Sequence, residues 1–161
     1  MANTVTIRLP QRVAKRLERE ADRLGTTLEE YVLELLLRDL DPPERAREYA
    51  EAARDLLEQA RKELEKGDVR QAAEKAWGAA ALAVKAYASW RDGKRLASHR
   101  ELWEYSRAMI QEMGDWVSDA WAQANAMHIC FPDGWCTREH VEQALKRIQK
   151  LVENVEKRVG T

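Results

Sequence analysis

The helix predicted by residues 67–86, GDVRQAAEKAWGAAALAVKA, decides the fold of this chain. Gly67 ends the segment before it, and Asp68 and Gln71 have the spacing of a capping box, in which two side chains satisfy the first N–H groups of a helix. From Ala76 to Val84 the segment is apolar on every side. Since a helix without a polar face is buried, we expect this one at the centre of a bundle.

Helical periodicity continues on both sides of this central segment. Further helices are predicted at about residues 43–66, 98–113, 115–127 and 137–159, with the few glycines and prolines lying between them. Because short links join antiparallel neighbours, residues 42–161 are predicted to form an all-α, four- to five-helix up-and-down bundle.

Residues 1–41 have a different pattern and are predicted to be a small separate module. Side chains alternate over residues 3–9: Thr4, Thr6 and Arg8 share one face, and Val5, Ile7 and Leu9 share the other. This alternation is typical of a β-strand. Two helices follow, one from Pro10 to a stop at Gly25 and one from Thr27, which has a capping-box partner in Glu30, to about Leu40. Since a lone strand must find a partner, we expect a homodimer that pairs two such strands, with the bundle adding to the contact.

Strand, helix, glycine turn and capped helix together resemble a ribbon-helix-helix module. In that family the paired strands can enter the major groove of DNA, and the start of the second helix holds a phosphate. By position, Thr4, Thr6 and Arg8 would face the groove, and Gly25, Thr26 and Thr27 would meet the phosphate. Glu29 and Glu30 stand where the phosphate would dock, however, so dimerisation is the favoured role of this module and DNA recognition is the alternative.

Composition excludes some classes of protein. The net charge is −1, and residues 1–41 hold seven of the 27 basic and eight of the 28 acidic side chains, so neither segment is basic overall. No stretch has the roughly 20 apolar residues that cross a bilayer, and the first residues lack the basic and apolar blocks of a signal peptide. We therefore expect a cytoplasmic protein without a membrane partner; the dense Glu, Lys and Arg content is also typical of thermophiles.

The quoted stretch 67–86 resembles the signature of the archaeal PaREP family of the first type. Residues 98–105 (SHRELWEY), residues 124–128 (ANAMH) and Gly134-Trp135 fit the same pattern. The resemblance covers nearly everything from Asp41 to Val159, and it implies a fold similar to the HEPN bundles, which bind nucleotides or cleave RNA without metal.

The resemblance does not carry over the ribonuclease chemistry. HEPN ribonucleases place an arginine shortly before a histidine, but the corresponding positions before His128 are Gln123, Ala122 and Trp121. No neutral side chain replaces a guanidinium at a phosphate transition state. A HEPN-type ribonuclease is therefore the least favoured function.

Several polar and aromatic side chains on and near the central helix are candidates for a ligand pocket. These residues are Glu74, Lys75, Trp77, Lys85, His99, Trp103, Trp121 and His128. A polar pocket of this kind would hold a small anionic or nucleotide-like ligand, with an indole stacked on a base. The alternative is structural, because buried charges usually pair with one another and tryptophans at helical spacing usually belong to the core.

Two cysteines flank the turn-forming residues Pro132-Asp133-Gly134. Cys130 and Cys136 could be two thiols, a disulfide across that turn, or ligands of zinc with His128 and His140. The spacing is not that of a standard zinc finger, and the PaREP pattern lacks both cysteines, so zinc is the least favoured state. No metal or other cofactor is expected.

Together these patterns predict a non-enzymatic, dimeric binding or interaction protein, whose bundle holds a nucleotide-like or anionic ligand or a protein partner. The alternative is a DNA-binding regulator or antitoxin-like protein that reads DNA through its N-terminal ribbon.

Overall fold

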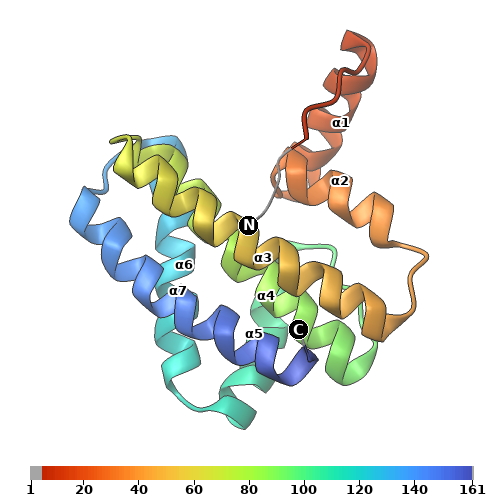
Figure 1. The fold of residues 1–161 in the computed structure, drawn as a ribbon, viewed down its shortest axis with the longest axis vertical. Helices are drawn as coiled ribbons and strands as arrows, with labels where there is room; N and C mark the ends of the chain where they lie inside the picture. Colours follow the sequence, from red (N-terminus) through yellow and green to blue (C-terminus); the bar gives the residue numbers. More distant parts are fainter. Residues whose placement is uncertain (1–4, 161) are drawn as a thin grey trace.

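The computed structural model describes residues 5–160, which form seven α-helices (Figure 1). The helices are α1 (Gln11–Leu24), α2 (Leu28–Leu37), α3 (Pro42–Glu65), α4 (Val69–Asp92), α5 (His99–Met113), α6 (Trp116–Asp133) and α7 (Arg138–Val159). The predicted all-helical class is confirmed. None of the helices in the described part of the chain is long and apolar enough to cross a membrane.

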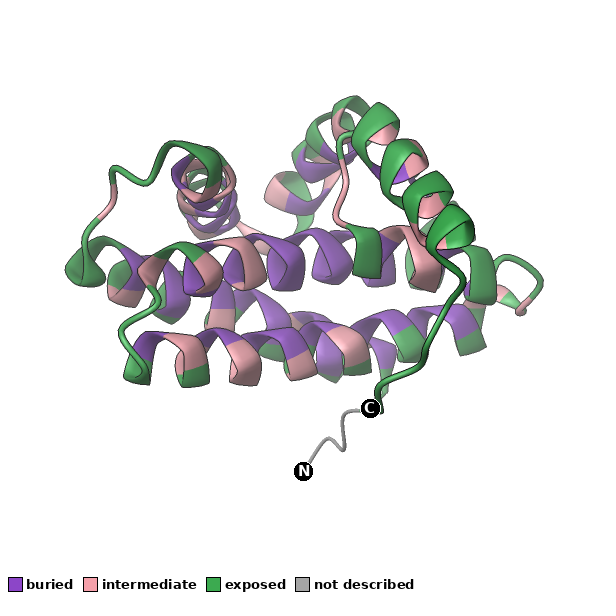
Figure 2. Ribbon diagram, turned by 90° about the horizontal axis from the view of Figure 1, so that it is seen from above, coloured by how far each residue is buried: buried purple, intermediate pink, exposed green. Residues whose placement is uncertain are grey.

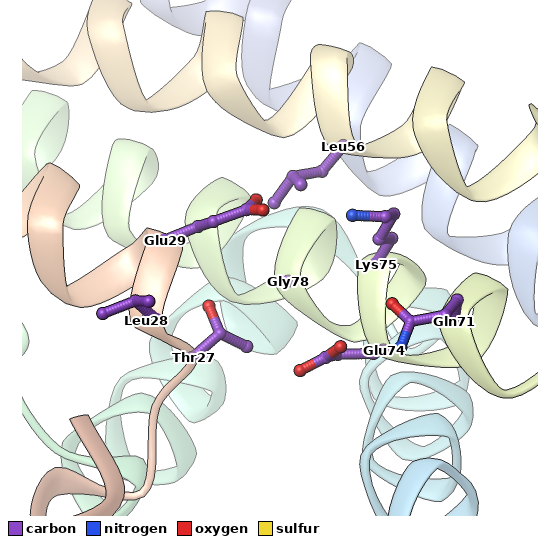
Figure 3. A pocket seen from close by; sticks show the side chains of 8 residues that line it. All are labelled: Thr27, Leu28, Glu29, Leu56, Gln71, Glu74, Lys75 and Gly78. Carbon is purple, nitrogen blue, oxygen red and sulfur yellow. The ribbon is translucent and has the colours of Figure 1, made fainter. Parts of the chain in front are cut away.

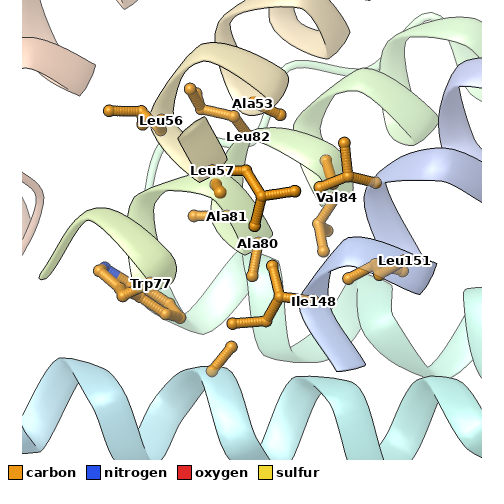
Figure 4. Close-up of a cluster of buried hydrophobic side chains, with 14 of the residues drawn as sticks. Ala53, Leu56, Leu57, Trp77, Ala80, Ala81, Leu82, Val84, Ile148 and Leu151 are labelled. Atoms are coloured by element: carbon orange, nitrogen blue, oxygen red, sulfur yellow. The ribbon is translucent and has the colours of Figure 1, made fainter. Parts of the chain in front are cut away.

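Helix α4 lies at the centre of the bundle and packs against α3, α5, α6 and α7. Every residue from Ala76 to Ser89 is buried, as the absence of a polar face predicted. Alanine fills half of these positions, and its small side chain lets neighbouring helices approach closely. Figure 4 shows Leu57 of α3, Ala80 and Val84 of α4 and Ile148 of α7 among the core side chains that meet there.

Local signals in the sequence explain where several helices begin. Ser98 and Glu101 form the complete predicted capping box at the start of α5. Thr137 accepts a hydrogen bond from the His140 N–H at the start of α7. Asp68 accepts one from the Gln71 N–H at the start of α4.

The predicted N-terminal strand is not seen among the described residues. Residues 5–9 form no β-strand and are exposed to solvent. A strand is defined by its hydrogen bonds to a second strand, and the described residues offer none. The two helices that follow form a hairpin that stands against one side of the bundle (Figure 2).

The number of helices in the assembly is higher than the four or five predicted for the bundle. Helix α2 contributes Leu37 to the hydrophobic core that α3–α7 share, and its Glu30 and Glu34 are also buried. The N-terminal pair therefore packs onto the bundle instead of standing apart from it.

Helix α6 also extends further than predicted, from Met127 to Asp133. Pro132 lies in its last turn, where a missing N–H removes only one helical hydrogen bond. The helix ends at Gly134, whose φ of 67° lies in the left-handed region that glycine adopts without strain. The side chain of Arg70 donates hydrogen bonds to the Phe131 and Pro132 carbonyls, so α4 supports this helix end.

Candidate functional site

A pocket of about 210 Å³ lies between the start of α2, one face of α4 and Leu56 of α3 (Figure 3). Its polar lining comes from Thr27 and Glu29 on one side and from Gln71, Glu74 and Lys75 on the other. The last three recur at helical spacing on α4, so one face of that helix presents them together. Gly78 forms part of the lining, where a Cβ atom would lie 2.9 Å from Leu56 Cδ1. A side chain at this position would have to displace the Leu56 side chain, so glycine leaves room for Leu56 of α3 to pack on α4.

Glu74 and Lys75 are the two candidate ligand residues that this pocket brings together. Both side chains are half-buried, and within residues 5–160 neither forms an ion pair or a side-chain hydrogen bond. Burial raises the pKa of the Glu74 carboxyl, while the neighbouring Lys75 lowers it. The pocket thus holds a carboxylate and an ammonium that have no hydrogen-bond or ion-pair partner among the described residues.

A second cavity, of about 460 Å³, adjoins the first and shares Thr27, Leu28 and Glu74 with it. Its far wall comes from the last turns of α6, with His128, Ile129, Phe131 and Pro132. The two cavities form one cleft beneath the α1–α2 turn, which we call the hairpin cleft. The cleft brings the predicted residues Glu74, Lys75 and His128 together.

Behind His128, four further candidate residues form a cluster of rings in the bundle interior. Ring centroids lie 4.7 Å apart for Trp77 and His128, 4.9 Å for Trp77 and His99, 5.0 Å for His99 and His128, 5.3 Å for Trp77 and Trp121, and 5.7 Å for Trp103 and Trp121. Trp77 and Trp121 are each 1% exposed, whereas Trp103 is 46% exposed. The tryptophans therefore pack mainly as core, with Trp103 at its edge.

Three nitrogens of this ring cluster are buried without a hydrogen-bond partner in the described residues: Trp77 Nε1, Trp121 Nε1 and His99 Nε2. Burial lowers the pKa of His99. Burial, together with the nearby His99, also lowers the pKa of His128. In both residues burial favours the neutral imidazole.

Lys85, the remaining candidate ligand residue, belongs to a buried ion network between α4 and α2. Its Nζ lies 2.9 Å from Glu34 Oε1 and 3.9 Å from Glu30 Oε2. The Tyr49 hydroxyl donates a 2.6 Å hydrogen bond to Glu34, and Arg95 lies 3.4 Å from its other oxygen. Lys85 therefore fits the structural interpretation rather than a ligand-binding one, because it neutralises two carboxylates of the hairpin.

Of the candidate DNA-contacting residues, Thr27 lines the hairpin cleft, and the others lie on the N-terminal segment that precedes α1. Thr4 lies outside the described residues, while Thr6 and Arg8 are exposed. Thr27 caps α2 by accepting a hydrogen bond from the Glu30 N–H. Glu30 does not return a bond to the cap, since its carboxylate accepts a 2.7 Å hydrogen bond from the Thr26 hydroxyl instead. A carboxylate thus occupies the first turn of α2, where a phosphate would dock.

Cys130 and Cys136 are joined by a disulfide, with their Cα atoms 5.7 Å apart. The left-handed turn at Gly134 returns the chain from the end of α6 so that the two cysteines face each other. His128 packs on Trp77 and His140 caps α7. No group of three or more His, Cys, Asp or Glu side chains in the described part of the chain is arranged to hold a metal ion.

Sequence reasoning missed four residues around the cleft: Glu29 as a pocket residue, Gly78 as its floor, and Glu30 and Glu34 as buried groups. Glu30 and Glu34 are four residues apart and share a face of α2 with Leu37. That spacing was the available signal, because it places two carboxylates on the face that packs inward.

The fold is that of an all-helical bundle with an N-terminal helical hairpin docked on its central helix. The chain belongs to the archaeal PaREP1/PaREP8 family, whose family profile matches residues 48–152, from α3 into α7. Searches of curated proteins and of solved structures gave no match. The family resemblance stated from the residues is thereby confirmed.

Proposed function

We propose that this chain is a homodimeric binding protein that holds a small polar ligand in the hairpin cleft. The observation that carries the proposal is the pair Glu74 and Lys75, which face the cleft half-buried and without an ion-pair partner among residues 5–160. Holding charged groups out of water costs free energy unless something pairs with them. A bound ligand with complementary charges would supply that pairing.

The two halves of the cleft differ in the ligand groups that they could hold. A nucleotide-like ligand, which the family resemblance implies, would find rings at His128 and Phe131 in the larger cavity. In the smaller pocket, Lys75 would be the cation available to an anionic group, whereas Glu29 and Glu74 would repel it. Binding without catalysis is favoured over RNA cleavage because the arginine that a HEPN-type site requires is absent before His128.

Dimer formation is supported by the distribution of exposed apolar side chains. Val5 is 80% exposed, Ile7 is 70% exposed and Leu36 of α2 is 72% exposed. Large apolar side chains that are this exposed favour an interaction site, and the alternation at residues 5–9 is suited to pairing with the same segment of a second copy. The N-terminal ribbon is therefore part of the proposed dimer.

A second candidate function, DNA recognition, is supported by a local excess of positive charge. Residues 5–17 contain Arg8, Arg12, Lys15 and Arg16 and no acidic residue, and these four side chains are exposed. Cations on an exposed segment attract phosphate. The acidic first turn of α2 weighs against this candidate, so it ranks second.

Mass spectrometry tests the ligand proposal. The full chain would be purified, denatured and analysed for small molecules released in stoichiometric amount. Glu74→Gln and Lys75→Met variants, purified in parallel, should release less, while Glu48→Gln, at an exposed position on α3, should release the same amount. Equal release from all four proteins, or release from none, would reject the hairpin cleft as a ligand site.

A further inference from the structure

The hairpin cleft continues along α2 into a further cavity. This cavity, of about 200 Å³, shares Glu29 and Leu56 with the pocket at Glu74. Together the two cavities follow α4 from Gln71 to Leu82, a distance of about 16 Å at the rise of an α-helix. We call this feature the α2 groove; α2 forms one wall, and α3 and α4 form the other.

The charges in the α2 groove are strongly unbalanced. Four carboxylates line it, those of Glu29, Glu30, Asp55 and Glu74, and Lys75 is the only lining cation among the described residues. Glu29, Asp55 and Glu74 form no ion pair within residues 5–160. The groove therefore carries an excess of negative charge that the described residues leave unpaired.

The pKa values of three carboxyls in the groove are raised mainly by burial. Burial raises the pKa of Asp55, and repulsion by the nearby Glu58 and Glu51 raises it further. Burial also raises the pKa of Glu30 more than Lys85 lowers it. Burial and like charge both shift the pKa of a carboxyl upward.

A second and independent observation points into the groove. Glu30 is 2% exposed, and its Oε1 atom has no hydrogen-bond partner in the described part of the chain. This oxygen lies 3.3 Å from the position that a Cβ on Gly78 would occupy, and Gly78 lines the groove. A buried acceptor without a donor costs free energy, and a ligand N–H group entering beside Gly78 would supply the donor.

The surfaces between the carboxylates are aliphatic. Leu28, Leu33, Leu56 and Leu82 line the groove, and no aromatic ring does. A fitting occupant thus has cationic N–H groups separated by methylene segments. Carboxylates repel an anion, and a nucleobase would find no ring to stack on.

We propose that the α2 groove binds a linear aliphatic polyamine, with its ammonium groups on Glu29, Glu30, Asp55 and Glu74 and its methylenes against the leucines. The inference rests on the proposed function, because the α2 groove includes the Glu74 pocket of the hairpin cleft, and it assigns a cationic ligand to that pocket in place of a nucleotide-like one. It gives Gly78 a further role, because any side chain there would stand between Glu30 Oε1 and the ligand.

Isothermal titration calorimetry of the full chain with the triamine spermidine at low ionic strength tests the proposal. We expect saturable binding that weakens about ten-fold or more in Glu74→Gln and in Asp55→Asn, since each change removes a charge-assisted hydrogen bond to an ammonium group. Glu48→Gln is the matched control and should bind as the unmodified chain does. Circular dichroism melting of each variant verifies that it is folded.

Two further titrations separate the possible outcomes. Equal heats from Mg²⁺ and from spermidine, or spermidine binding that both variants leave unchanged, would overturn the proposal in favour of general charge attraction. If AMP binds and Lys75→Met abolishes its binding while spermidine gives no heat, the polyamine inference fails and the ligand-binding function stands. If neither compound binds and nothing co-purifies, both fail.

Discussion

Lys85 of α4 and Glu34 of α2 form an ion pair of 2.9 Å in which both side chains are almost wholly withdrawn from water. The pair joins the N-terminal hairpin to the central helix of the bundle. The Tyr49 hydroxyl of α3 also donates a hydrogen bond to Glu34, so both α3 and α4 stabilise this buried carboxylate of α2. The hairpin is thus anchored by charge neutralisation in addition to the burial of Leu37.

This anchor predicts a large effect of Lys85→Met on stability. Removing one partner of a buried pair leaves an uncompensated charge, so the free energy of unfolding should fall by about 3–5 kcal/mol. Lys75→Met is the matched control on the same helix, because Lys75 forms no ion pair in the described residues; it should change stability by no more than about 0.5 kcal/mol. Urea unfolding of both variants measures the difference, and equal losses would show that the pair is not an anchor.

Lys85 and its surroundings show which parts of the fold can be predicted from the sequence. The apolar run around it predicted a buried helix, because periodicity reports which faces meet water. The partners Glu30 and Glu34 were not predicted, because they lie about 50 residues away and the docking of α2 on α4 is a tertiary contact without a local signature. For the same reason, the sequence identified each residue of the ring cluster as a candidate, but it did not predict that Trp77 and Trp121 pack in the core while Glu74 and Lys75 line a pocket.

The proposed dimer predicts that Ile7→Asp weakens self-association. A charge at a position that is 70% exposed in the single chain costs little by itself, but it would be buried between two copies if residues 5–9 pair. Sedimentation velocity over a range of concentrations should show a dimer for the unmodified chain and monomer for the variant. Ile129→Asp, at another exposed apolar position, should remain dimeric; an Ile7→Asp protein that associates as strongly as the unmodified chain would exclude this interface.

DNA recognition, the second candidate function, predicts a specific dependence on Arg8. If its guanidinium reads a base, Arg8→Ala should cost roughly 1–3 kcal/mol of binding free energy. Fluorescence anisotropy with duplex DNA at several salt concentrations measures this, and Arg107→Ala, at an exposed position on α5, serves as the control. Tight binding in moderate salt that survives Arg8→Ala would place the DNA contact on another surface.

The buried histidines predict a loss of stability in mild acid. Burial lowers the pKa of His99 and of His128 from their ordinary value of 6.5, so the unfolded chain takes up protons more readily than the folded chain. The stabilisation is present above the unfolded-state pKa and is lost as the pH falls through the lowered folded-state values. The urea midpoint should therefore fall between about pH 7.5 and about pH 5.

The carboxyls of Glu30, Asp55 and Glu74 act in the opposite direction, because each has a raised pKa in the folded chain. The comparison that isolates the histidines is the double change His99→Gln with His128→Gln, which should flatten the acid-dependent decrease. A pH profile that the double change does not alter would mean that the ring cluster takes up no protons on unfolding.

The disulfide predicts both a chemical and a thermal signature. From sequence, the two cysteines and the turn between them left thiols, a bridge and zinc all open, since spacing alone does not determine side-chain geometry. Six positions separate Cys130 from Cys136, and closing a loop of that size stabilises by about 2 kcal/mol through the entropy of the unfolded chain. Reduction should therefore lower the melting temperature by roughly 4–8 °C. A variant with Cys130→Ala and Cys136→Ala should melt at the same temperature with and without reductant.

Thiol counting on denatured, unreduced protein should find no reactive thiol. Two thiols per chain would show that the bridge is not formed, and stoichiometric zinc in the same sample would assign the cysteines to a metal instead.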